Sequence, residues 1–89
     1  MEYTELLKNY RDQIDTLDKE IIYLLSRRFI IVNEIWKLKK DNNIKPLQND
    51  RWNKLLAENI DVANELGVSE NLITDIWNRI HKESLDIEN

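Results

Sequence analysis

The sequence contains no cysteine, only one glycine and only one proline in 89 residues. Without cysteine the chain can form no disulfide and carry out no thiol chemistry, and such a composition suits a reducing compartment. Few glycines and prolines leave long segments uninterrupted, and the abundant leucine, isoleucine, lysine, glutamate and asparagine favour helices over strands. The composition therefore predicts an all-α fold.

Long apolar runs are missing as well. No stretch approaches the roughly 20 apolar residues of a membrane-spanning helix. The acidic start MEYTELLKNY lacks the basic and apolar regions of a signal peptide. The net charge of −4 disfavours nucleic acid as a partner, because binding phosphates requires a basic surface. We therefore expect a cytoplasmic protein with no membrane or nucleic-acid partner.

Three segments carry the apolar periodicity of helices. The first is expected to run from Thr4, a candidate N-cap, to about Asp41, with apolar residues at three- and four-residue steps. The segment DNNIKPLQN interrupts this pattern and is expected to form a loop. The second helix is then expected to begin at Gln48 or Asn49 and to end before Gly67, which suits a C-terminal cap.

The third helix is expected to begin after Ser69 as N-cap, with Glu70 in its first turn. Its apolar and small residues again recur at helical steps. The inner face of this helix is expected to carry Leu72, Ile73, Ile76, Trp77, Ile80, Ser84 and Ile87.

The expected first helix is too long for so small a chain to cover. At about 1.5 Å per residue it would span about 55 Å, and a chain of 89 residues makes only a modest core. From about Ile21 onward, apolar residues occupy more than one face, so we expect this half to be covered from several directions. The simplest cover is a second copy of the chain, which predicts a homodimer.

Several basic residues could surround one small molecule. Arg28 and Lys39 are eleven residues apart, about three turns plus 20°, so they share one helix face about 16 Å apart. Arg11 lies about 25 Å before Arg28 and could reach the same molecule only from the second copy in an antiparallel dimer. Arg51, at the start of the second helix, could fold back over the end of the first. Such a group of cations suits a small dianion or trianion, because the arginine fork binds carboxylates.

Basic residues on helices are more often solvated, so this assignment depends on agreement with a known pattern. The segment YRDQIDTLDKEIIYLLSRRF, with the helix that follows, resembles the N-terminal helix of the all-α chorismate mutase family. The family's pattern is met at Arg11, Ile14, Asp15, Leu17, Asp18, Ile21, Ile22, Leu24, Leu25, Arg28 and Lys39.

The later segments also resemble this family. PLQNDRW is similar to the family's segment with a polar residue three positions before an arginine, here Gln48 and Arg51. IWNRIHKESLDIE is similar to its C-terminal helix, which carries a serine and, four residues later, a glutamine or glutamate, here Ser84 and Glu88. Because the resemblance covers nearly the whole chain, we expect residues 1–89 to form a single domain of this type.

The resemblance implies an intertwined homodimer of three-helix chains in which Arg11 of the partner subunit completes each site. It also implies the Claisen rearrangement of chorismate to prephenate, a step toward phenylalanine and tyrosine. That reaction needs no metal, cofactor or nucleophile, so catalysis would rest on conformational restriction and electrostatics. Arg28 and the partner's Arg11 would bind the two carboxylates, and Lys39 would donate a hydrogen bond to the ether oxygen.

The remaining site residues take roles by the same resemblance. Arg51 would add positive potential, Gln48 would contact the ring hydroxyl, and Ser84 would assist a carboxylate. Trp52 stands where some members carry a glutamate, so it would be either a pocket wall or a core aromatic residue. Glu88 stands where many members carry glutamine. An ionised Glu88 would repel the ether oxygen, whereas a protonated one could donate to it, and its penultimate position is one where helices fray.

Three alternatives stay open. An isochorismate pyruvate lyase uses the same cationic scaffold, and a 4-amino-4-deoxychorismate mutase would fit the change at Trp52. A non-catalytic helical dimerisation module would explain the heptads but not the matching site positions. His81, the only histidine, is expected to be structural or exposed because the reaction needs no base. The acidic residues lack metal-binding spacing, so no metal is expected.

Overall fold

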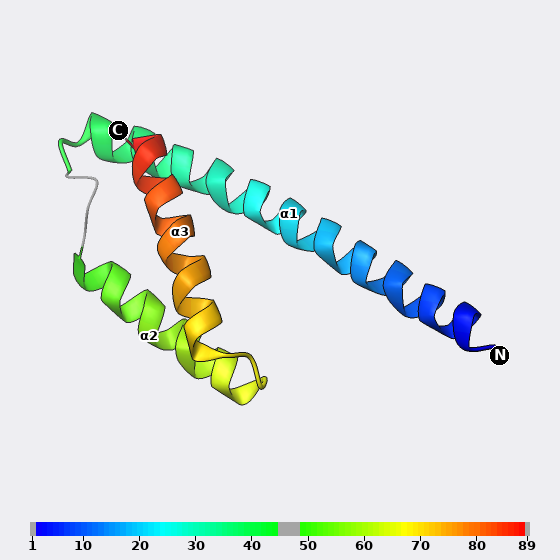
Figure 1. Ribbon diagram of the computed structural model, residues 1–89. Coiled ribbons are helices and arrows are strands. Elements are labelled where there is room, and N and C mark those ends of the chain that lie inside the picture. Colours follow the sequence, from blue (N-terminus) through cyan, green and yellow to red (C-terminus); the bar gives the residue numbers. More distant parts are fainter. Residues whose placement is uncertain (1, 45–48, 89) are drawn as a thin grey trace. The chain divides into compact units, whose positions relative to one another are not determined.

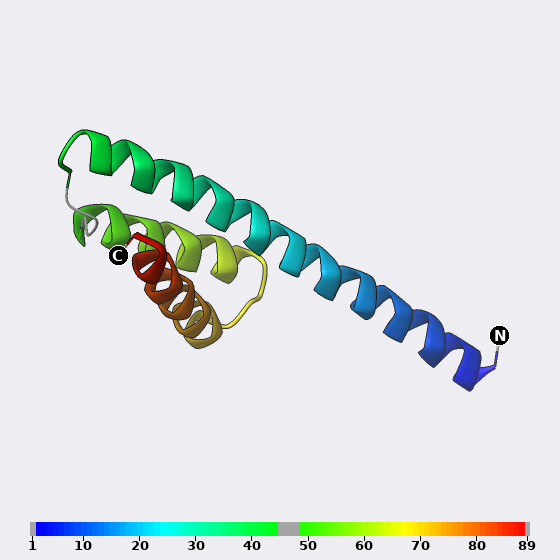
Figure 2. The same cartoon turned by 90° about the horizontal axis from the view of Figure 1, so that it is seen from above.

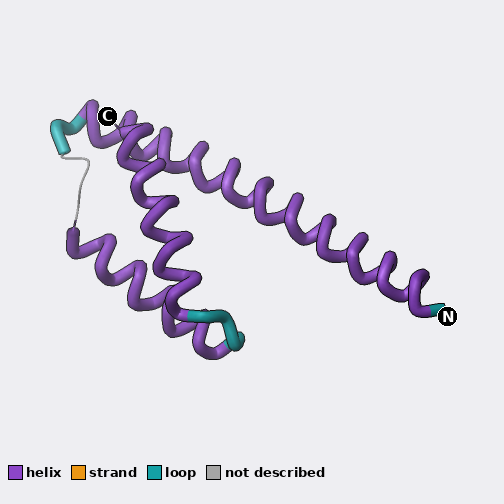
Figure 3. The backbone as a smooth tube through the Cα atoms, in the orientation of Figure 1, coloured by secondary structure: helices purple, strands orange, loops and turns teal. Residues whose placement is uncertain are grey.

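The computed structural model describes residues 2–44 and 49–88, and in these the chain forms three helices and no strand (Figures 1 and 3). Helix α1 spans Tyr3–Asp41, α2 spans Asn49–Glu65 and α3 spans Glu70–Glu88. This confirms the expected all-α class with one long and two shorter helices. None of the three, over the described residues, combines the length and apolar character needed to cross a membrane.

Helix α1 begins slightly earlier than the sequence predicted. The Leu6 N–H donates to the Glu2 carbonyl at 3.0 Å, which closes a first turn that already contains Thr4. The prediction of Thr4 as the N-cap was therefore wrong by one residue or more. Helix ends are the least determined part of a periodic pattern, because the apolar repeat does not mark the residue where the turn begins.

The cap between α2 and α3 has the predicted glycine. Gly67 adopts a φ of +73°, which a residue with a side chain rarely tolerates. Its N–H donates to the Asn64 carbonyl at 3.3 Å, and the Val68 N–H donates to the Ala63 carbonyl at 2.8 Å. These two hydrogen bonds form a Schellman motif, which satisfies carbonyls that the helix end would otherwise leave unpaired.

Ser69 caps α3 as predicted. Its Oγ accepts a hydrogen bond from the Leu72 N–H at 3.3 Å, and its carbonyl accepts one from the Ile73 N–H at 3.1 Å. Glu70 lies in the first turn, where its negative charge interacts favourably with the helix dipole. The short loop between Gly67 and Ser69 therefore has a cap at each end and reverses the chain within a few residues.

The structure divides into two compact units, residues 1–31 and residues 32–89. The first unit consists of the N-terminal part of α1, and α1 contains no buried residue. Its apolar side chains at Ile14, Leu17 and Ile21 are 56%, 56% and 55% exposed. The sequence predicts cover from several directions from about Ile21 onward, and among the described residues no side chain of α1 is buried.

The second unit contains the end of α1 together with α2 and α3, and α2 and α3 lie side by side in opposite directions (Figures 1 and 2). Among the described residues, the buried hydrophobic side chains are Ala63 on α2 and Ile80 on α3. The predicted inner face of α3 is only partly correct, because Leu72 and Ile76 are exposed. A single neighbouring helix covers a narrower part of the circumference than the apolar stripe occupies.

Candidate active site

An ion pair joins the last turn of α1 to the last residue of α3. Lys39 Nζ lies 3.5 Å from Glu88 Oε1, and the two side chains are only 14% and 8% exposed. Charges removed from water in this way are costly unless each has a partner. The other ion pairs found among residues 2–44 and 49–88 are largely exposed, and such surface pairs contribute little to stability. They are Lys8–Asp12, Lys37–Glu34 and Arg79–Glu83.

A second Schellman motif closes the C-terminal end of α1, where Lys39 lies. The Ile44 N–H donates to the Lys39 carbonyl at 2.8 Å, and the Asn43 N–H donates to the Lys40 carbonyl at 3.4 Å. Asn43 takes the left-handed position with a φ of 57°, in place of the glycine that usually stands there. Asn42 adds a side-chain hydrogen bond from Nδ2 to the Leu38 carbonyl at 2.8 Å. The final turn that presents Lys39 is therefore closed by hydrogen bonds.

Glu88 differs from the expectation that a penultimate residue frays. It belongs to α3 and is among the most buried residues of the described chain. The reason is tertiary, because its carboxylate reaches the ammonium group of Lys39 on another helix. The C-terminal end of α3 is thus held by a contact with another helix, which the periodicity of α3 does not predict.

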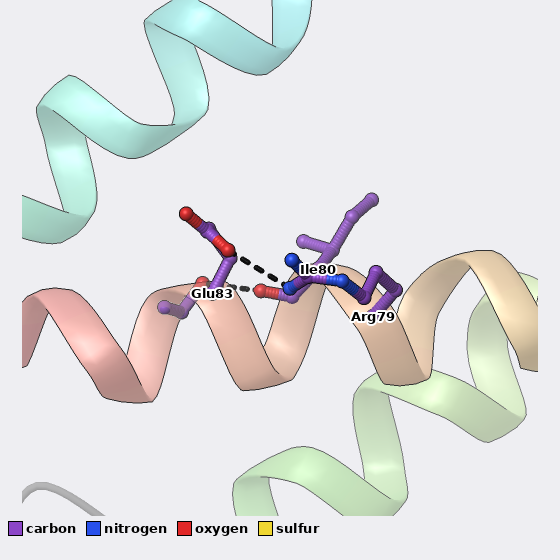
Figure 4. A network of polar contacts seen from close by, with 4 residues as sticks. Arg79, Ile80 and Glu83 are labelled. Carbon is purple, nitrogen blue, oxygen red and sulfur yellow. Dashed lines mark hydrogen bonds and ion pairs between the residues drawn. The ribbon is translucent and has the colours of Figure 1, made fainter.

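Ser84 lies one turn before Glu88 on the same face of α3. Its Oγ donates to the Ile80 carbonyl at 3.0 Å, and the side chain is half-buried. Nearby on α3, Arg79 donates to Glu83 at 2.8 Å (Figure 4), and this contact is exposed, whereas the contact of Ser84 with Ile80 is part-buried. The face that carries Ser84 and Glu88 is the covered one.

Trp52 is stacked on His81. The two ring centroids are 4.0 Å apart and the ring planes differ by 15°. Both residues are half-buried, Trp52 in the first turn of α2 and His81 on α3. The structural role expected for His81 is compatible with this contact, and the stack gives Trp52 an intramolecular partner. The sequence does not predict this pair, because an aromatic contact between two helices has no local signature.

The remaining predicted site residues fall in both compact units. Arg51 lies in the first turn of α2 and is exposed, while Gln48 lies outside the described residues. Arg28 is half-buried and Arg11 is exposed, and both belong to the first compact unit. Within the second unit, one contact joins two predicted site residues, that of Lys39 with Glu88.

No group of three or more histidine, cysteine, aspartate or glutamate side chains that could hold a metal ion occurs in the described part of the chain. The chemistry that Lys39 and Glu88 can perform is electrostatic. A lysine ammonium with little access to water can donate hydrogen bonds to an oxygen that gains negative charge, and its effect is stronger there than in solvent.

Comparison with known proteins decides the family. Residues 10–89 match the family described as chorismate mutase type II. The chain belongs to that family. The match confirms the resemblance seen in the first-helix motif, and with it the expected enzyme class, a chorismate mutase.

Relatives were also found among curated proteins. The chain is 33% identical over 89 residues to a T-protein of Haemophilus influenzae, covering 100% of this chain and 24% of the relative. It is 35% identical over 79 residues to a T-protein of Enterobacter agglomerans, covering 89% of this chain and 21% of that relative. The chain thus spans about a quarter or less of the length of these relatives. No solved structure matched the chain.

Proposed function

We propose that residues 1–89 form a single chorismate mutase domain that rearranges chorismate to prephenate. The observation that carries this proposal is the buried pair of Lys39 and Glu88. In a chain of this family, Lys39 is the residue that the resemblance predicts as the donor to the ether oxygen, and its side chain is only 14% exposed. The proposal accounts for the burial of both charges, because a purely structural role could be filled as well by a pair of apolar side chains.

The reaction needs a compact substrate conformation and stabilisation of the charge that develops as the C–O bond breaks. No proton has to be transferred, so the side chains act by holding the substrate in the reactive conformation and by stabilising charge electrostatically. Lys39 donates to the ether oxygen as negative charge grows there, and such a donor is worth about 3–4 kcal/mol in the transition state. Glu88 holds the ammonium group of Lys39 in position through their ion pair at 3.5 Å.

The two substrate carboxylates are bound by arginines in this proposal. Arg28 binds one, and Arg11 of the partner subunit binds the other, each through its planar fork. Arg51 adds positive potential from the first turn of α2, where it is exposed. Gln48 contacts the ring hydroxyl and Ser84 assists a carboxylate.

A homodimer is part of the proposal, because the apolar face of α1 needs cover. Its side chains at Tyr10, Ile14, Leu17, Ile21 and Leu24 are exposed and follow a 4-3-4-3 spacing. This spacing is the heptad pattern by which two helices pack against each other. An antiparallel pairing of two copies would also bring Arg11 of the partner subunit toward Arg28 and Lys39.

The decisive experiment follows the ultraviolet absorbance of chorismate during incubation with the protein and with its Lys39→Ala and Lys40→Ala variants. We expect the unaltered chain to consume chorismate and Lys39→Ala to lower kcat by about 10²–10³-fold. Lys40, the exposed neighbour of Lys39, serves as the matched control and should leave kcat within twofold. If chorismate persists, or if both variants are equally impaired, the proposal is wrong.

Two further assays separate the related possibilities. Incubation with isochorismate and detection of salicylate fluorescence would identify a lyase, and the same test with 4-amino-4-deoxychorismate would identify the amino-substrate enzyme. The cytoplasmic setting and the homodimer are parts of the proposal that cell fractionation and analytical ultracentrifugation test directly. A monomer at micromolar concentration would contradict the shared site.

A further inference from the structure

The stack of Trp52 on His81 lies beside the proposed site without belonging to its reacting groups. It joins the first turn of α2 to α3, with ring centroids 4.0 Å apart and nearly parallel planes. Stacked aromatic rings contribute more than the area they bury, because their geometry restricts how the two elements can turn. The contact therefore restricts how α3 can turn relative to α2.

The spacing along α3 connects this stack to the ion pair. His81, Ser84 and Glu88 are separated by three and four residues, so they lie within about 60° of one another on the helix face. His81 and Glu88 are about 10 Å apart along the axis, too far for direct contact. This face of α3 is thus contacted from α2 at His81 and from α1 at Glu88.

We infer that the Trp52–His81 stack is a positioning contact, which holds the final turns of α3 so that Glu88 meets Lys39. The expected effect on catalysis rests on the proposed function, whereas the effect on the end of α3 does not. Helix α3 ends at Glu88, where a helix would otherwise fray. Small displacements of a group in a site of this kind reduce the rate strongly, since donors act only when they are aimed at the developing charge.

The first test measures hydrogen exchange of the backbone amides of residues 84–88 in His81→Ala. We expect exchange there to become about 3- to 10-fold faster, the change that follows from losing one aromatic pair. His81→Phe retains a flat ring and should restore slow exchange. Lys82→Ala alters the exposed neighbouring position on the same helix and is the matched control. Unchanged exchange in His81→Ala, or an equal change in Lys82→Ala, would overturn the inference.

The second test measures kcat and KM for chorismate in His81→Ala, Glu88→Ala and the double variant. We expect His81→Ala to lower kcat about 3- to 10-fold with KM nearly unchanged, and His81→Phe to restore it. In the Glu88→Ala background, His81→Ala should have no further effect, because the residue that it positions is gone. An equal loss of kcat in both backgrounds would show that His81 acts in another way and would overturn the inference.

The two experiments keep the inference separate from the function on which it rests. If the unaltered protein leaves chorismate intact, the proposed function is wrong, while the exchange experiment still decides whether the stack holds the end of α3. If chorismate is consumed but His81→Ala changes neither exchange nor kcat, the function stands and the positioning contact is refuted.

Discussion

Replacing Glu88 by alanine tests whether the buried ion pair stabilises the fold. At 3.5 Å and an effective dielectric constant of about 20, the attraction between the two charges is about 5 kcal/mol before desolvation. Desolvation removes much of this gain, and the variant loses a carboxylate that pairs with a lysine that has little access to water. We expect Glu88→Ala to lower the free energy of unfolding by about 2–3 kcal/mol.

The same helix provides a matched control. Glu83 pairs with Arg79 at 2.8 Å, a shorter distance than that of the buried pair, but the two side chains are 47% and 67% exposed. Solvent screening and side-chain entropy should limit the cost of Glu83→Ala to about 0.5 kcal/mol. Comparing the two variants therefore separates the effect of burial from the effect of distance.

Urea unfolding followed by circular dichroism at 222 nm measures both variants. The protein concentration must be equal throughout, because the stability of a dimer depends on it. The slope of the unfolding free energy with urea concentration should be the same for both variants if only native-state contacts differ. If Glu88→Ala costs no more than Glu83→Ala, the ion pair does not stabilise the fold and the reasoning from burial fails.

Two further predictions concern the site and its supporting helix end. Mixing inactive Arg11→Ala with inactive Lys39→Ala chains after joint refolding should restore part of the activity, since a mixed dimer contains one intact site; no recovery would exclude a shared site. Asn43→Ala should lower the free energy of unfolding by about 1 kcal/mol, because alanine resists the φ of 57°, and Asn43→Gly should not, as thermal unfolding would reveal.

Much of the local structure could be predicted because its causes lie close together in the chain. The cap at Gly67 requires a residue without a side chain, and the cap at Ser69 requires a short side-chain acceptor, so both are visible as residue types. The cap at Asn43 was missed, since asparagine takes the left-handed conformation less regularly than glycine. The start of α1 was also missed, because the apolar repeat does not mark it.

The family and the candidate site depended on spacing over a longer range. Arg28 and Lys39 share a helix face by arithmetic alone. The motif of the first helix indicated the family, and the order and spacing of Arg51 and Ser84 supported it. Arithmetic along one helix cannot show which side chains from different helices meet. For this reason the direct pairing of Lys39 with Glu88 was not predicted.

By itself, the sequence determined the all-α class, the approximate extents of the three helices and the positions at which the family's charged residues recur, because each follows from residue type and periodicity along the chain. Only the tertiary structure decided that Glu88 is buried against Lys39 and that Trp52 stacks on His81. These contacts arise where separate helices meet. Their geometry depends on how α2 and α3 pack and on how α1 ends, which no repeat within a single helix encodes.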